Sequence, residues 1–426
     1  MGELNKLQKE EESPGRTLSC SILIFRGILL VANTQGSHNE YPAKPPKVTL
    51  LTTNQGRTRF GPNLYSCGKV CLTWHGNSGE NWSPAQGLES VLLSIQSLLS
   101  TDPYYNEPGF ERTESSSHSK AVKDYNSKVF QQGKDTPIDR SQIIHENLRL
   151  TVISPLEALL FTGHELPPNE VETEAELVAP WHAGIFDDYI KQRFMWYLAS
   201  YKQTIKEQSQ VIQTQERNGA HFPLARFENQ GNQMEGSWKY PDLRQRLDKI
   251  EATLMKEIQG WPVQGRQLVI QDAGIAVNLR GQHGQIAAQL NQMTESMVEL
   301  ELVKDNPFLW RLTYFGRPMT TLDGGVLRIK IYISPRHPAE QPRVFLETPV
   351  FHINVSPTGA LIYLPARAED MSKHIQGIIN VLEEETPAYN PIMIVNPEAA
   401  KLFWGTKDER RLYNRKLRNS LTEATE

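Results

Sequence analysis

Three short segments decide the fold: residues 61–72, GPNLYSCGKVCL; residues 82–85, WSPA; and, upstream of both, residues 41–48, YPAKPPKV. Asn63 precedes Cys71 by eight residues, so a Pro-Asn pair and a Gly-Lys-Val-Cys-Leu run stand at a fixed spacing. A proline-rich segment, a Pro-Asn pair, a cysteine and a Trp-Ser-Pro helix start therefore follow one another. This order is more specific than any one of its parts.

Strands and then a helix are predicted around these segments. Up to about Val70, short apolar runs separated by Gly, Pro and Asn favour strands. The most apolar run, residues 21–31, is predicted to be a buried strand, because it is too short to cross a bilayer and the residues before it lack the charge pattern of a signal peptide. Ser83 as a cap, with Gln86 three residues later, predicts a helix start. The apolar face of this helix recurs at helical spacing: Leu88, Val91, Leu92, Ile95, Leu98 and Leu99.

Composition bounds the class of protein. The 426 residues are 38% hydrophobic and 22% charged, which is typical of a globular protein, and a formal net charge of -4 favours neither nucleic acid nor an anionic membrane as partner. Three cysteines, Cys20, Cys67 and Cys71, are too few for a disulfide scaffold or a four-cysteine zinc site. We therefore expect a reducing compartment and neither a metal nor another cofactor.

Beyond the first hundred residues, helices and strands alternate in a pattern typical of an α+β protein. The periodicity predicts helices over residues 181–213, 243–258, 286–303, 372–385 and 399–417, and strands over residues 310–314 and 326–333.

The segments quoted above resemble the core of ubiquitin-conjugating enzymes, in which a proline-rich turn, a Pro-Asn pair, the thioester cysteine and a Trp-Ser-Pro helix start occur in this order. Residues 82–110, residues 145–149 (HENLR) and the helical extension to about Ile258 resemble the Z-type members in particular. The resemblance covers residues 21–260. It implies the ubiquitin-conjugating fold, an antiparallel sheet flanked by helices.

The resemblance also implies roles for three residues. Cys71 would carry ubiquitin or a related modifier as a thioester, because a thiolate is both a good nucleophile and a good leaving group. Asn63 would donate a hydrogen bond to the oxyanion that forms during transfer, and Glu107 would orient or deprotonate the attacking lysine. Two plainer readings stay open: Asn63 as the cap of a turn, and Glu107 as a solvated turn residue.

The chain departs from the family pattern at three places. Gly61 stands where many members have His before Pro-Asn, and Ala43 stands where many have a bulky apolar residue that docks ligases. The family's first helix and full opening hairpin are not expected before Ser21. Since those parts usually meet the activating enzyme, a rival function is a non-catalytic scaffold that binds ubiquitin or ligases.

A second, altered copy of the same plan is predicted between residues 290 and 418. His337-Pro338 and Pro342-Arg343-Val344 match the proline-rich turn, and His352-Ile353-Asn354 matches the Pro-Asn segment. Ile362 stands eight residues after Asn354, and no cysteine follows Cys71. This copy is predicted to have the conjugating fold without its nucleophile, as a binding domain or as a purely structural module.

The predicted boundaries are a disordered start at 1–20, an N-terminally shortened conjugating core at 21–160, a helical extension at 161–260, a linker at 261–285 and an inactive conjugating-like domain at 286–426. The expected partners are ubiquitin or a ubiquitin-like modifier, a ubiquitin-activating enzyme, ubiquitin ligases and substrate proteins. The expected location is the cytoplasm, the nucleus or both.

Overall fold

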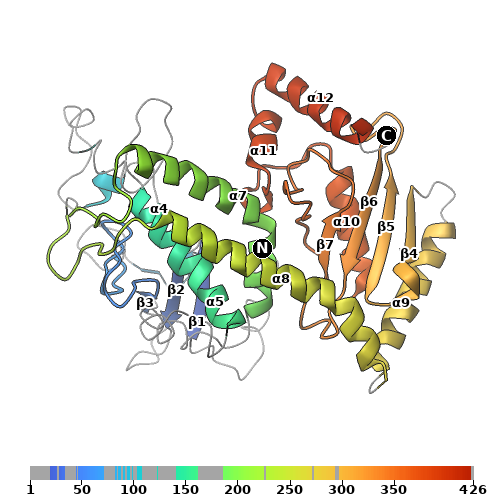
Figure 1. The fold of residues 1–426 in the computed structure, drawn as a ribbon, viewed down its shortest axis with the longest axis horizontal. Coiled ribbons are helices and arrows are strands. Elements are labelled where there is room, and N and C mark those ends of the chain that lie inside the picture. The colour runs from blue at the N-terminus through green and yellow to red at the C-terminus, as the bar shows by residue number, and fades with distance from the viewer. Residues whose placement is uncertain are drawn as a thin grey trace. The chain divides into compact units, whose positions relative to one another are not determined.

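The computed structural model describes residues 20–25, 28–33, 45, 47–71, 82–83, 85–87, 90–91, 94–95, 98, 103–107, 122, 141–161, 186–224, 227–270, 273–292 and 297–423. They fall into two compact units (Figure 1). The first unit lies within residues 3–183 and 205–247, and the second lies within residues 184–204 and 248–426. Two long helices, α7 (Asp187–Thr214) and α8 (Tyr240–Leu268), each contribute residues to both units.

The sheet of the first unit has three antiparallel strands in the order β1 (Cys20–Phe25), β2 (Ile28–Asn33) and β3 (Lys47–Leu50). Ile22 pairs with Val31 in the hairpin of β1 and β2. The single strand predicted over residues 21–31 is therefore wrong. The chain reverses between Phe25 and Ile28. The Arg26-Gly27 pair, which interrupts the apolar run there, was the sequence signal for this reversal.

The Ser83 and Gln86 contacts predicted for the helix start form, but the helix begins later than predicted: Gln86 and Gly87 are not helical, and the first described helical residue is Ser90. Gln86 Oε1 accepts a hydrogen bond from the Ser83 N–H at 3.2 Å, and Ser83 Oγ accepts one from the Ala85 N–H at 3.3 Å. Ser90, Val91, Ser94, Ile95 and Leu98 are helical, and the rest of the predicted helix after Ser90 lies outside the described residues. Its apolar face packs into a cluster made by Leu50, Phe60, Leu64, Val91, Ile95 and Leu150.

A helical segment of the first unit runs through α4 (Ser141–Asn147), the π-helix Leu148–Ile153 and α5 (Ser154–Leu160). A buried polar network lies at its beginning. His145 accepts a hydrogen bond from the Lys239 N–H at Nε2 (3.0 Å), which leaves Nδ1 to donate to Glu146 at 2.9 Å. Burial acts to raise the pKa of Glu146, but hydrogen bonds from His145 and Arg149 and the Arg149 charge lower it to about 2. The network fixes α4 against the residues that lead into α8.

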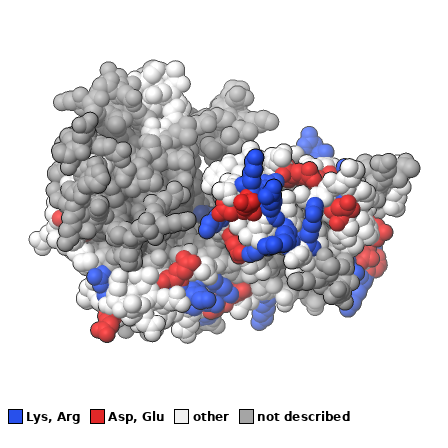
Figure 2. Space-filling view, turned by 90° about the horizontal axis from the view of Figure 1, so that it is seen from above, with Lys and Arg blue, Asp and Glu red and all other residues white. Residues whose placement is uncertain are grey.

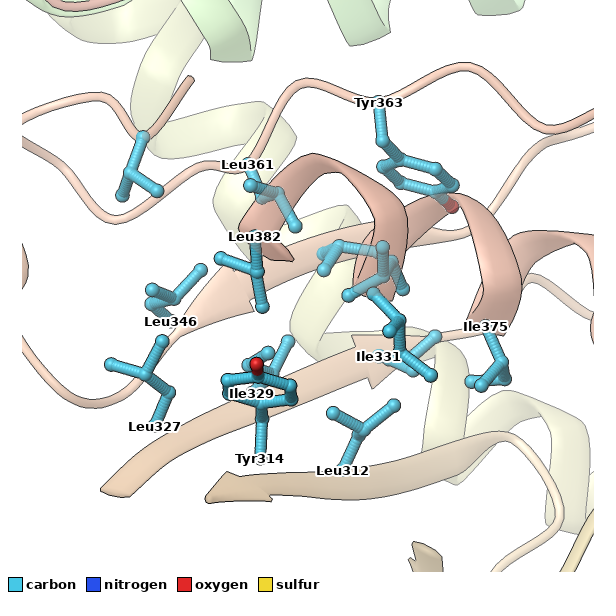
Figure 3. Close-up of a cluster of buried hydrophobic side chains, with 14 of the residues drawn as sticks. Leu312, Tyr314, Leu327, Ile329, Ile331, Leu346, Leu361, Tyr363, Ile375 and Leu382 are labelled. Carbon is cyan, nitrogen blue, oxygen red and sulfur yellow. The ribbon is translucent and has the colours of Figure 1, made fainter. Parts of the chain in front are cut away.

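The second unit has a four-stranded antiparallel sheet in the order β4 (Val298–Leu302), β5 (Leu309–Phe315), β6 (Val326–Tyr332) and β7 (Arg343–Leu346). Its helices are α9 (Gly274–Gln292), α10 (Met371–Glu383), α11 (Pro397–Phe403) and α12 (Lys407–Glu423). The core lies between sheet and helix (Figure 3): Leu312, Ile329 and Ile331 from the strands meet Ile375 and Leu382 from α10. This antiparallel sheet with helices agrees with the predicted α+β class.

Three predicted helices differ from the structure. The helix expected over residues 286–303 is wrong, because α9 ends at Gln292 and Val298–Leu302 is strand β4. The VELEL sequence of β4 alternates apolar and charged residues with period two, which is the strand pattern. The helix expected over residues 399–417 is divided into α11 and α12. Residues 243–258 lie inside the longer helix α8, and the described part of the expected linker, 261–285, is largely helical.

Charge is mixed on the surface. Figure 2 shows Lys and Arg side chains interspersed with Asp and Glu over the described part of the face that it draws. That distribution matches the small formal net charge of -4. Among the described helices, none is both long and apolar enough to cross a membrane.

Candidate active site

The loop that carries Cys71 folds back on itself through backbone hydrogen bonds. The Cys71 N–H donates to Asn63 O at 2.8 Å, and the Gly68 N–H donates to Tyr65 O at 3.0 Å. Gly68 has a φ of +86°, and a Cβ there would lie 2.9 Å from Leu50 O. Glycine is therefore required at this turn. The turn brings Cys71 and Asn63 side by side.

The Asn63 side chain is held by a hydrogen bond to a second segment of the chain. It is only 8% exposed, and its Nδ2 donates to Asn106 O at 3.3 Å. Asn106 belongs to the 3-10 helix Pro103–Asn106, and its own Nδ2 donates to Leu98 O at 2.9 Å. A side-chain amide carries two N–H groups, so the contact with Asn106 uses only one of them. The second N–H is the group that the oxyanion role requires.

Glu107 follows Asn106 directly and lies near Tyr65, a residue that the sequence reasoning missed. Burial raises the pKa of Tyr65, and the charges of Glu107 and Cys71 raise it further. Glu107 Oε2 is buried and has no hydrogen-bond partner among the described residues. Tyr65 therefore lies within electrostatic range of Glu107 and Cys71, and its place two residues after Asn63 was the only sequence signal for it.

Buried Arg59 holds the loop that carries Cys71 through hydrogen bonds to its backbone. Its guanidinium donates to Gly61 O at 3.1 Å, to Pro62 O at 2.9 Å and to Phe227 O. It also lies 4.9 Å from the centroid of the Tyr65 ring. Ser66 adds hydrogen bonds to Gly231 O and to the Asn232 side chain. Residues 227–232, far along the chain, therefore help to fix the conformation of the cysteine loop.

The altered copy repeats this loop in the second unit. The Ile362 N–H donates to Asn354 O at 3.0 Å, and Asn354 Nδ2 donates to Met393 O at 2.8 Å. Gly359 has a φ of +84°, with its Cβ position 2.9 Å from Leu346 O. Ile362 thus occupies the place of Cys71, as predicted. Cys71 is partly exposed, whereas Ile362 is 1% exposed.

No group of three or more His, Cys, Asp or Glu side chains among the described residues is arranged to hold a metal ion.

Comparison with known proteins finds the same family twice. The model of the ubiquitin-conjugating enzyme family matches residues 36–132 and 283–420, together more than half of the chain. Ubiquitin-conjugating enzyme E2 Z of Xenopus tropicalis is 45% identical over 119 residues, which cover 28% of this chain and 33% of that protein. The human E2 Z is 43% identical over 119 residues, covering 28% and 29%.

A third relative matches a shorter segment. The human dual E2 ubiquitin-conjugating enzyme/E3 ubiquitin-protein ligase BIRC6 is 51% identical over 80 residues, which cover 17% of this chain and 2% of that protein. The matched region thus spans about a third or less of the length of these relatives. With two matched segments and the same loop built twice, the chain belongs to the ubiquitin-conjugating enzyme family and has a second conjugating-type region.

Proposed function

We propose that the protein accepts ubiquitin or a ubiquitin-like modifier from an activating enzyme as a thioester on Cys71 and passes it to a substrate lysine or to a ligase. The observation that carries the proposal is the partly exposed Cys71 thiol, held against Asn63 by the Cys71 N–H to Asn63 O hydrogen bond. Tyr65 lies within electrostatic range of both Cys71 and Glu107. The cytoplasm and the nucleus are the proposed locations.

Charging is an exchange of thioesters. The Cys71 thiolate attacks the carbonyl carbon of the modifier's thioester on the activating enzyme, and a new S–C bond forms. The activating enzyme's sulfur leaves as a thiolate. Because one thioester replaces another, little free energy is lost, and the acyl group stays activated for the next step.

Discharge is an aminolysis. The neutral lysine Nζ attacks the carbonyl carbon, the S–C bond breaks, and the Cys71 thiolate leaves while the amine loses a proton. Negative charge develops on the carbonyl oxygen during the attack, and the free N–H of Asn63 would stabilise it. Glu107, whose Oε2 has no partner among the described residues, is available to orient the amine or to accept its proton.

The proposal is tested by incubating the protein with an activating enzyme, ATP and ubiquitin, followed by a non-reducing gel. We expect a band shift that DTT removes. Cys71→Ser should abolish the shift or convert it to a DTT-resistant oxyester. Cys67→Ser is the matched control, because Cys67 is an exposed thiol on the same loop and should be dispensable.

An undiminished DTT-sensitive band in Cys71→Ser would contradict the assignment of the nucleophile. No band with wild-type protein, in a reaction where the activating enzyme charges another conjugating enzyme, would favour the rival function of a non-catalytic scaffold.

A further inference from the structure

In the second unit, the position that corresponds to Cys71 is closed by the first half of α7. Ile362 belongs to a cluster of buried apolar side chains with Trp196, Ala360 and Val395. Tyr189 and Tyr197, also from α7, pack against the same cluster. All of these residues belong to the second unit.

Hydrogen bonds from α7 to backbone carbonyls fix this packing. Trp196 Nε1–H donates to Leu361 O at 3.0 Å, immediately before Ile362. The Tyr197 hydroxyl donates to Ile392 O at 2.5 Å, immediately before Met393, whose own carbonyl accepts from Asn354. The two aromatic side chains therefore bind both segments that surround the Ile362 position.

A buried ion pair anchors the beginning of the helix. Arg343 is 3% exposed, and its guanidinium donates to both carboxylate oxygens of Asp188. Asp188 also accepts a hydrogen bond from the Gln341 N–H at 3.0 Å. Asp188 and Trp196 are eight residues apart, so they lie on one face of α7. The helix is thus held along a face of more than two turns.

From this geometry we infer that the altered copy uses its Ile362 face as an intramolecular receptor for residues 187–204 of α7, and that this helix keeps any modifier from lying there. Ile362 therefore has a packing role of its own in addition to lacking a thiol. An aliphatic side chain packs against the Trp196 ring without leaving a buried polar group unpaired. This inference concerns the second unit and holds whether or not Cys71 is charged.

The test measures the accessibility of a thiol placed under the helix. In a Cys20→Ser, Cys67→Ser, Cys71→Ser background, Ile362→Cys introduces one cysteine at the covered position. Leu364→Cys, two residues along the same segment, is the matched control because Leu364 is 57% exposed. Reaction with Ellman's reagent under native conditions should be at least about 10-fold slower for Ile362→Cys, since the reagent must wait for local opening. Equal rates would overturn the inference.

A second variant identifies α7 as the cover. Trp196→Ala, added to each protein, should speed the reaction of Ile362→Cys by about 10-fold or more and leave Leu364→Cys unchanged. An unchanged Ile362→Cys rate would overturn the role of α7. Circular dichroism checks the fold. Where Trp196→Ala unfolds the second unit, Asp188→Asn replaces it in the same comparison with the same two outcomes, because it weakens the contacts of Asp188 with Arg343 and the Gln341 N–H and leaves the Trp196 ring in place.

Discussion

The Cys71 loop and the Ile362 loop have nearly the same backbone and opposite surroundings. The hydrogen bonds Cys71 N–H to Asn63 O and Ile362 N–H to Asn354 O are 2.8 and 3.0 Å long, and both loops turn at a glycine with a φ near +85°. The backbone arrangement is therefore not itself the reactive feature. One side chain, together with what covers it, separates a candidate nucleophile from a packing position.

The two loops are also braced differently. Each loop is held by residues far along the chain. Buried Arg59 holds the first loop, reaches Phe227 O and leaves Cys71 partly exposed. Trp196 holds the second loop by binding Leu361 O and packs against Ile362 itself.

The largest expected effect concerns Trp196, which holds the Ile362 loop. Trp196→Ala removes a nearly buried ring and its hydrogen bond, so the second unit should lose about 3–5 kcal/mol of stability. Hydrogen exchange should then show lost protection of residues 359–363. Trp238→Ala, at a buried tryptophan of the first unit, is the mirror control and should spare those residues. Undiminished protection in Trp196→Ala would break the comparison.

The two asparagines should differ in catalysis although their contacts match. Asn63→Ala should charge at a near-normal rate but release ubiquitin to free lysine about 100-fold more slowly, because an oxyanion donor acts only as the amine attacks. Asn354→Ala should change neither rate. Single-turnover discharge assays separate the two steps. Equal losses in charging and discharge for Asn63→Ala would instead indicate a structural role as the cap of a turn.

The two glycines should behave alike. Gly68→Ala and Gly359→Ala each place a Cβ 2.9 Å from a carbonyl oxygen on a backbone with φ above +80°. Each should destabilise its own unit by about 1–2 kcal/mol. Denaturant unfolding followed by hydrogen exchange assigns the loss to a unit. Gly324→Ala, which has a φ of +76° and an open Cβ position, separates the backbone strain from the close contact.

The smallest expected effect per residue is a pH dependence of the second unit. Burial lowers the pKa of His352 and of His374 to about 4 each. Below the unfolded value near 6.5, the unfolded chain binds protons that the folded unit does not, so stability falls as the pH falls from 6.5 towards 4. Between pH 7.5 and 6.0 each histidine should cost about 1 kcal/mol.

Glu146 in the first unit also loses its contribution as the pH falls, but in a lower pH range. With a pKa of about 2, it contributes stability above its unfolded pKa of about 4.5, and this is lost only as the pH falls from there towards 2. Urea unfolding at the two pH values checks the contrast. A second unit that is equally stable at pH 7.5 and 6.0 would contradict the burial of neutral histidines, and His352→Asn should reduce the slope.

Local order along the chain was sufficient to predict part of this molecule. Three predicted features depend only on residues close together in the sequence. They are the eight-residue spacing of Asn63 and Cys71, the hydrogen bonds between Ser83 and Gln86, and Ile362 at the nucleophile position of a second copy. The structure contains each arrangement. Such features follow from backbone sterics and short-range hydrogen bonds, which residue type and spacing specify directly.

Tertiary packing decided the rest. The pairing of β2 with β3 and of β6 with β7 joins segments whose partners the sequence did not predict. Arg59 lies 168 residues from Phe227, and Trp196 lies 165 residues from Leu361. No local pattern encodes such contacts, because they form only when burial and chain closure bring distant segments together. That is why the motif predicted which residue could react, and only the packed structure could reveal that a helix covers its counterpart.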